Sequence, residues 1–261
     1  MMQITPMVRN LLIMNGVIFV MTTMIFPESV LQFALYNFES SKFRPYQLIT
    51  HMFLHGGFSH LFMNMFSLFI FGPMLEHHWG SNRFLTFYLI TGLGASLLYQ
   101  GVRGFEMADM RKDVQSYISA PSPMAFKDFL DEHFPGKYNV RAVAQYQRNA
   151  DNPELIRSTI ESVKEIYETV KNVPMLGASG AVFGILMAFG MLFPNTELML
   201  LFFPVPIKAK YFVLMYGALE LYSGLARTPG DNVAHFAHLG GMLFAYILLK
   251  YWERNDRKNF Y

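Results

Sequence analysis

One serine stands among small residues at the start of an apolar run. Ser179 lies in the tetrad Gly177 to Gly180, which opens a stretch long enough to enter a membrane. Such a serine can act as a nucleophile when a base takes its proton. Gly177 would let a substrate backbone approach, and free N–H groups at a helix start can stabilise a developing negative charge. The alternative is helix packing, because Gly180 and Gly184 form a small-xxx-small face.

The histidine that could activate this serine lies near the C-terminus. His235 begins another apolar run, and a neutral imidazole there can accept a hydroxyl proton. Gly240 and Gly241 would let this run pack closely against the serine segment. His238 is the rival base, and either histidine could instead be a buried side chain satisfied by a neighbour. Asp231 falls in an expected loop, so we predict a serine–histidine dyad with His235 as the base.

Four further polar residues lead into an earlier apolar run: His51, His55, His60 and Asn64. Imidazoles four residues apart can chelate a metal, but no carboxylate joins them at ligand spacing and the zinc-protease pattern His-Glu-x-x-His is absent. We therefore expect neither metal nor cofactor. His60 and Asn64 could each donate a hydrogen bond to an oxyanion. For His51 and His55, capping or hydrogen bonding across a packed bundle is an equal alternative.

The composition indicates the setting for this chemistry. Of 261 residues, 52% are hydrophobic and only 15% are charged, as in a membrane protein. A formal net charge of +2 and the lack of a basic cluster argue against nucleic-acid binding. The absence of cysteine excludes thiol catalysis and thiolate metal sites.

Apolar runs predict an all-α membrane protein with six transmembrane helices. The expected spans are Leu11 to Phe26, Leu61 to Leu75, Phe84 to Gly101, Met175 to Phe193, Tyr211 to Leu225 and Val233 to Tyr251. Lys and Arg gather at one set of span ends, so the positive-inside rule places both termini in the cytoplasm. We expect an integral, multi-pass protein of a bacterial inner membrane.

A polar segment interrupts this pattern between the third and fourth spans. Residues 104–173 carry nine Lys or Arg and eleven Asp or Glu and contain no candidate span. We predict a soluble, outward-facing insertion that divides a single bundle into residues 1–103 and 174–261. Asn152 and Pro153 should start an amphipathic helix that ends near Lys171. A second amphipathic stretch, Leu198 to Phe212, should lie along the inner interface.

Together these residues resemble the rhomboid family of intramembrane serine proteases. The family pattern has two histidines and an asparagine on the second span, Gly-x-Ser-Gly at the fourth and a histidine on the sixth. The resemblance implies that Ser179 is the nucleophile and His235, after Ala234, the general base. His60, Asn64 and the N–H of Ser179 would form the oxyanion hole.

Other roles also follow from the resemblance. Phe183 replaces a tyrosine that many relatives carry under the catalytic imidazole, so it would support that ring by stacking alone. Glu76 matches a structural glutamate at the inner end of span two, and His51 and His55 would support the first loop. Tyr46-Gln47 stands where many relatives have Trp-Arg.

The implied function is hydrolysis of peptide bonds in or near transmembrane segments of single-pass or polytopic membrane proteins. The bilayer is the second partner, and the sequence does not indicate an oligomeric state. A catalytically inactive rhomboid-like protein that binds membrane clients is one alternative. A proton-relaying transporter is another, although no inverted repeat is visible and the polar sites cluster toward one side.

Overall fold

The chain is mainly helical, as predicted. A computed structural model describes residues 3–200, 203–226 and 233–258. The helices before residue 120 are α1 (Pro6–Val20) with a π-helical extension (Met21–Ile25), α2 (Ser29–Phe33), α3 (Gln47–Thr50) with a 3-10 turn (His51–Phe53), α4 (Phe58–Trp79) and α5 (Ser81–Ser119). Later elements are α6 (Pro123–His133), α7 (Val140–Arg148), α8 (Pro153–Lys171), α9 (Ser179–Leu192), β1 (Glu197–Leu200), β2 (Phe203–Lys208), α10 (Ala209–Ala226) and α11 (His235–Lys258).

Six of these helices form the bundle, and each coincides with or overlaps one predicted span. Its core is built mainly from buried side chains of α1, α4, α5, α9, α10 and α11. By length and composition, three described helices are suited to cross a membrane: Pro6–Ile25, Phe58–Trp79 and Ser81–Ser119. Helix α9 is shorter but apolar. That the chain crosses the membrane six times therefore stays a prediction.

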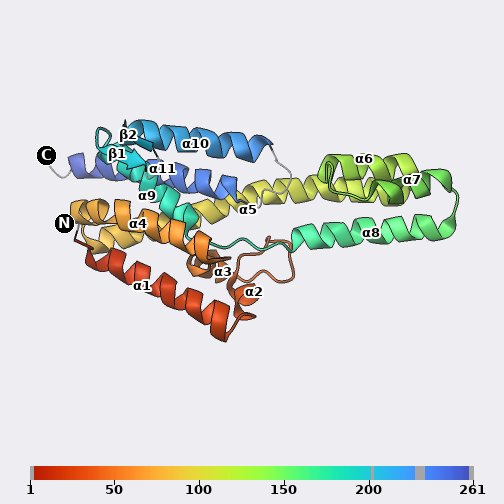
Figure 1. Cartoon of the computed structure of the whole chain (residues 1–261), viewed down its shortest axis with the longest axis horizontal. Coiled ribbons are helices and arrows are strands. Elements are labelled where there is room, and N and C mark those ends of the chain that lie inside the picture. The colour runs from red at the N-terminus through yellow and green to blue at the C-terminus, as the bar shows by residue number, and fades with distance from the viewer. Residues whose placement is uncertain (1–2, 201–202, 227–232, 259–261) are drawn as a thin grey trace.

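Helix α5 links the bundle to the inserted segment. It continues unbroken past residue 104, where the insertion was expected to begin, and ends at Ser119. Its last turns pack with α6, α7 and α8 around a second hydrophobic cluster that includes Met110, Tyr117 and Val163. Figure 1 shows these helices at the end of the molecule opposite to both chain termini. The insertion is thus a helical subdomain with its own core, built on an extended bundle helix.

The predicted start of α8 is confirmed. The Asn152 side chain accepts hydrogen bonds from the N–H groups of Glu154 and Leu155, and Pro153 occupies the first helical position. An Asn cap followed by Pro satisfies N–H groups that a helix start leaves free and fixes the backbone for the first turn. This local signal was sufficient to place the helix boundary.

The segment from Leu198 to Phe212, which we expected to lie along the inner interface, is mostly strand rather than helix. Most of it forms an antiparallel hairpin of β1 and β2, in which Glu197 pairs with Lys208 and Leu198 with Ile207. Only its end, from Ala209, is helical. Pro204 and Pro206 fit a strand here, because proline lacks the N–H that a helix interior requires and suits an edge strand.

Glu76 ties the end of α4 to the start of α1. Its buried carboxylate accepts hydrogen bonds from the N–H groups of Met7 and Val8, both at 2.9 Å, and from the Ser81 hydroxyl at 2.6 Å. These two N–H groups belong to the first turn of α1, where no helical partner is available. Glu76 therefore caps a neighbouring helix, which fits the structural role expected for it.

The loop before α4 is fastened to the strand-like segment before α9. Leu35 and Met175 exchange two backbone hydrogen bonds, at 2.9 and 2.8 Å. Gln47 organises the same loop, because its amide donates to the carbonyls of Gln32 and Lys42. These bonds hold the first loop next to the beginning of α9, where the candidate nucleophile lies.

Candidate active site

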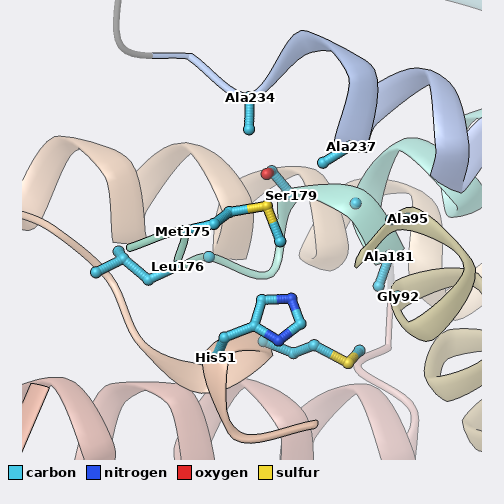
Figure 2. Close-up of a pocket in the computed structure, with 12 residues that line it drawn as sticks. His51, Gly92, Ala95, Met175, Leu176, Ser179, Ala181, Ala234 and Ala237 are labelled. Atoms are coloured by element: carbon cyan, nitrogen blue, oxygen red, sulfur yellow. The ribbon is translucent and has the colours of Figure 1, made fainter. Parts of the chain in front are cut away.

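Ser179 is the first residue of α9, at the end of a short, strained approach. Gly177, two residues earlier, has φ = +130°, a conformation that favours glycine, and its N–H donates to the His51 carbonyl at 2.9 Å. Figure 2 shows Ser179 between two alanines on one side, Ala234 just before α11 and Ala237 within it, and Met175 on the other side. The adjoining cavity measures about 10 Å³, close to the space one water requires.

His238 is the imidazole that contacts this serine. Its Nε2 lies 2.9 Å from Ser179 Oγ, within hydrogen-bond distance. The sequence-based pairing of Ser179 with His235 was therefore wrong in its choice of histidine. Residues three apart on a helix differ in direction by about 60°, so only packing decides which one meets a neighbour. The sequence did hold a signal in favour of His238. Ala237-His238 is followed within three residues by Gly240 and Gly241, whereas no glycine follows Ala234-His235 as closely.

Phe183, one helical turn after Ser179, supports the same imidazole. Its ring stacks on that of His238 with centroids 4.2 Å apart and an interplanar angle of 8°. The predicted stacking of Phe183 on the imidazole at the serine is thus present, although that imidazole belongs to His238.

Sequence reasoning missed Glu220 of α10. Its Oε2 lies 2.8 Å from His238 Nδ1 and 2.6 Å from His235 Nδ1, and the three side chains are only 10–13% exposed. Glu220 is the one Asp or Glu within the six predicted spans. This position is a sequence signal for a functional residue, because ionisable residues at membrane depth are usually functional. Asp231, considered as a third member, lies outside the described residues.

The Glu220, His235 and His238 side chains could also be read as a metal site. One potential ligand atom from each lies within 4.8 Å of the others. The two short hydrogen bonds to a single carboxylate oxygen already account for this spacing. His235 and His238 are not the histidines before α4, such as His51 and His55, for which the sequence raised the alternative of a metal site.

Glycines bring the helices of the site together. A Cβ on Gly241 would lie 2.8 Å from the carbonyl carbon of Gly180, so α11 and α9 touch along their backbones. Gly184 packs against Thr91 of α5 in the same manner. Gly240 faces Ala95 of α5 rather than α9. Close packing at Gly180, Gly184 and Gly241 is confirmed, and it sets the distance between Ser179 and His238.

The two predicted oxyanion donors lie on the first turns of α4. A Cβ on Gly177 would meet His60 Nε2 at 2.8 Å, which places the His60 ring beside the serine loop. A long hydrogen bond of 3.5 Å runs from the Gly56 N–H to His60 Nδ1. Asn64 is buried one turn further on, and its amide donates to the His60 carbonyl at 3.0 Å.

His51 and His55, which precede α4, are also buried. His51 Nδ1 lies 2.8 Å from the Gln47 carbonyl, and the residue lines the cavity beside Ser179. The His55 ring meets that of His60 edge-on, with centroids 5.1 Å apart. Burial lowers the pKa of both to about 4, with nearby His60 adding to the effect on His55. The role of these two histidines in supporting the first loop stays a prediction.

Comparison with known proteins identifies the family of the chain. The rhomboid domain model matches residues 42–107 and 155–253, leaving out most of the insertion. The chain is 26% identical over 258 residues to RHOMBOID-like protein 12, mitochondrial, of Arabidopsis thaliana, covering 97% of this chain and 59% of that protein.

Two other rhomboid proteins are also similar in sequence to this chain. An uncharacterized mitochondrial rhomboid protein of Schizosaccharomyces pombe is 26% identical over 86% of this chain and 57% of its own length. RHOMBOID-like protein 6, mitochondrial, of Arabidopsis thaliana is 51% identical over 53 residues, which are 20% of this chain and 17% of that protein. The chain thus spans less than two thirds of each relative. Its match to the domain model on both sides of the insertion shows that this integral membrane protein belongs to the rhomboid family.

Proposed function

We propose that the protein is an intramembrane serine endopeptidase in which Ser179 is the nucleophile and His238 the general base. The observation that carries the proposal is the 2.9 Å contact between Ser179 Oγ and His238 Nε2 at the start of an apolar helix. Nucleophile and base within hydrogen-bond reach, with the base oriented by a third group, are the signature of nucleophilic catalysis.

The chemistry follows from this contact. Ser179 Oγ attacks the carbonyl carbon of the scissile peptide while His238 Nε2 takes the hydroxyl proton. The same proton then passes to the leaving amine, and an acyl-enzyme on Ser179 remains. A water activated by His238 hydrolyses the ester and regenerates the serine. The small cavity beside Ser179, about 10 Å³, is close to the space that one water requires.

The oxyanion of the tetrahedral intermediate needs donors on the opposite side of the serine. The Ser179 N–H belongs to the first turn of α9, which has no helical acceptor, and it points along the positive end of the helix dipole. His60 Nε2 lies beside Gly177, and the Gly56 contact to Nδ1 leaves Nε2 to carry the proton. Asn64 would rotate from the His60 carbonyl to become the third donor.

The family acts on membrane proteins within the bilayer, and we propose the same class of substrate here. A helical amide is shielded by its own hydrogen bond, so cleavage requires local unwinding of the substrate near Ser179. Substrates with small or helix-breaking residues at the cleavage site should be preferred. The named relatives above are mitochondrial, which does not support the expected bacterial inner membrane. The compartment and the cytoplasmic placement of the termini stay predictions.

Cleavage of a transmembrane reporter by purified protein in liposomes tests the proposal. Wild type should cut the reporter, and Ser179→Ala and His238→Ala should each lower kcat by at least about 1000-fold. His235→Ala should keep measurable activity, because His235 does not occupy the position next to Ser179. A fluorophosphonate probe should label wild type and not Ser179→Ala.

Two results would overturn the assignment. Cleavage by Ser179→Ala would place the nucleophile elsewhere. Failure of wild type to cut varied reporters or to take up the probe would favour the alternative, a rhomboid-like protein that binds membrane clients without cleaving them.

A further inference from the structure

We propose that Glu220 is a positioning residue that holds His238 in the tautomer required of a base, so that the site operates as a serine–histidine–glutamate triad rather than a dyad. This inference rests on the proposed function, because it assigns Glu220 a role in the reaction of Ser179 and His238. It replaces the dyad expected from the sequence.

The first argument concerns which nitrogen of His238 carries the proton. An ionised carboxylate has no proton to donate, so the 2.8 Å contact with Glu220 Oε2 requires a proton on His238 Nδ1. In a neutral imidazole the other nitrogen is then a bare acceptor. That nitrogen, Nε2, is the one 2.9 Å from Ser179 Oγ. The hydrogen bond from Ser179 to His238 therefore has the direction that general-base catalysis needs.

The second argument concerns the charge that develops during the reaction. When His238 takes the serine proton it becomes a cation, and the carboxylate of Glu220 lies in direct contact with it. Both side chains are nearly buried, at 10% and 13% exposure, so solvent screens this attraction only weakly. An attraction that appears only after proton transfer lowers the barrier rather than strengthening substrate binding.

His235 completes the arrangement from the other side. Its Nδ1 lies 2.6 Å from the same Oε2 atom, so a single carboxylate oxygen bridges two histidines of α11. Two donors on one oxygen restrict rotation of the Glu220 side chain. We assign His235 the role of orienting Glu220. This histidine does not contact Ser179 as the base His238 does, and it acts on the reaction only through Glu220.

The decisive variant is Glu220→Gln, which keeps the shape of the side chain and removes its charge. We expect kcat for a transmembrane reporter to fall about 100-fold while KM stays close to wild type. His235→Gln should lower kcat less, because its effect passes through Glu220. Glu253→Gln is the matched control on α11: Glu253 pairs with Lys250 far from the serine, and this variant should behave as wild type.

A spectroscopic measurement tests the tautomer without relying on turnover. In protein carrying ¹⁵N-labelled histidine, the imidazole nitrogen shifts of His238, assigned by loss of its signals in His238→Gln, should report a proton on Nδ1 in wild type. The same nitrogens should shift toward the other tautomer in Glu220→Gln. This readout decides the question even if Glu220→Gln proves unstable, because the wild-type tautomer alone can contradict the proposal.

The outcomes separate the two levels of the argument. If wild type cleaves and Glu220→Gln keeps kcat within about threefold of it, Glu220 is not a positioning residue, yet the serine protease assignment stands. A wild-type His238 protonated on Nε2 would also overturn the role of Glu220. If wild type itself cleaves nothing, the proposed function fails first, and a proton on Nδ1 would then describe a structural hydrogen bond only.

Discussion

The rings of Phe183 and His238 lie almost parallel, 4.2 Å apart, on two helices that meet at glycine backbones. This stack fixes the plane of the imidazole, and Glu220 fixes its rotation within that plane. Together they aim Nε2 at the Ser179 hydroxyl. The orientation of the imidazole thus depends on one ring stack and one hydrogen bond to a carboxylate, which come from different helices.

Replacing Phe183 should separate stacking from simple filling of space. Phe183→Leu keeps an apolar side chain of similar bulk but loses the flat surface, and we expect kcat to fall up to roughly tenfold, since an aromatic pair is worth about 1 kcal/mol beyond its buried area. Phe183→Tyr preserves the ring and should retain most of the activity. Reporter cleavage at saturating substrate measures both. Equal activity of Phe183→Leu and wild type would show that the stack does not orient His238.

Gly241→Ala should disrupt the site by forcing two helices apart. The added methyl group would meet backbone atoms of Gly180, which cannot move aside as a flexible side chain can. We expect a loss of about 3 kcal/mol in the free energy of unfolding and a failure of the fluorophosphonate to label Ser179. The control is Gly101→Ala in α5, where an added Cβ meets nothing within 4 Å. That variant should be as stable as wild type or more so.

Glu76→Gln should weaken the attachment of α1 without changing the chemistry. The neutral amide cannot accept all three hydrogen bonds that the carboxylate receives from Met7, Val8 and Ser81. We expect the free energy of unfolding to fall by about 2 kcal/mol, and Ser81→Ala, which removes one donor, to cost about half as much. Thermal unfolding in detergent measures the change. The kcat per probe-labelled molecule should stay at the wild-type value, and a fall in that value would place Glu76 in the reaction.

Stability should decrease in mild acid because of His55, and His51, whose pKa burial also lowers to about 4, should add a similar loss. Burial holds its pKa at about 4, below the ordinary 6.5, so between these values the unfolded chain binds a proton that the folded protein excludes. Nothing is lost above pH 6.5, and His55 by itself should lower the free energy of unfolding by up to roughly 3 kcal/mol as the pH approaches 4. His55→Leu removes one of these two buried titrating groups and should weaken this dependence, while His51 keeps its own share of it. Identical pH profiles for wild type and His55→Leu would contradict this account.

Local signals in the sequence were sufficient for much of the architecture. Runs of apolar residues predicted helices, and the charged segment predicted an insertion between the third and fourth. Asn152-Pro153 marked the start of α8 because capping depends on neighbours in the chain. Gly180 and Gly184, four residues apart, share one helix face, which is why close packing could be expected before any partner was known. Ser179 could be predicted as a nucleophile from local sequence as well, because its hydroxyl stands at the start of an apolar run.

The partners of Ser179 could not be fixed in this way. Whether His235 or His238 meets it depends on the rotation of α11 about its axis, and the contact between Gly241 and Gly180 sets that rotation. Glu220 reaches the site from α10, 15 and 18 residues before the two histidines, and no spacing rule links it to them. The sequence determined which chemical groups the membrane helices carry. Only the packing of α9, α10 and α11 decided which of those groups touch. A helix sets the direction of its own side chains, but the rotation and position of the neighbouring helix decide which side chain they meet.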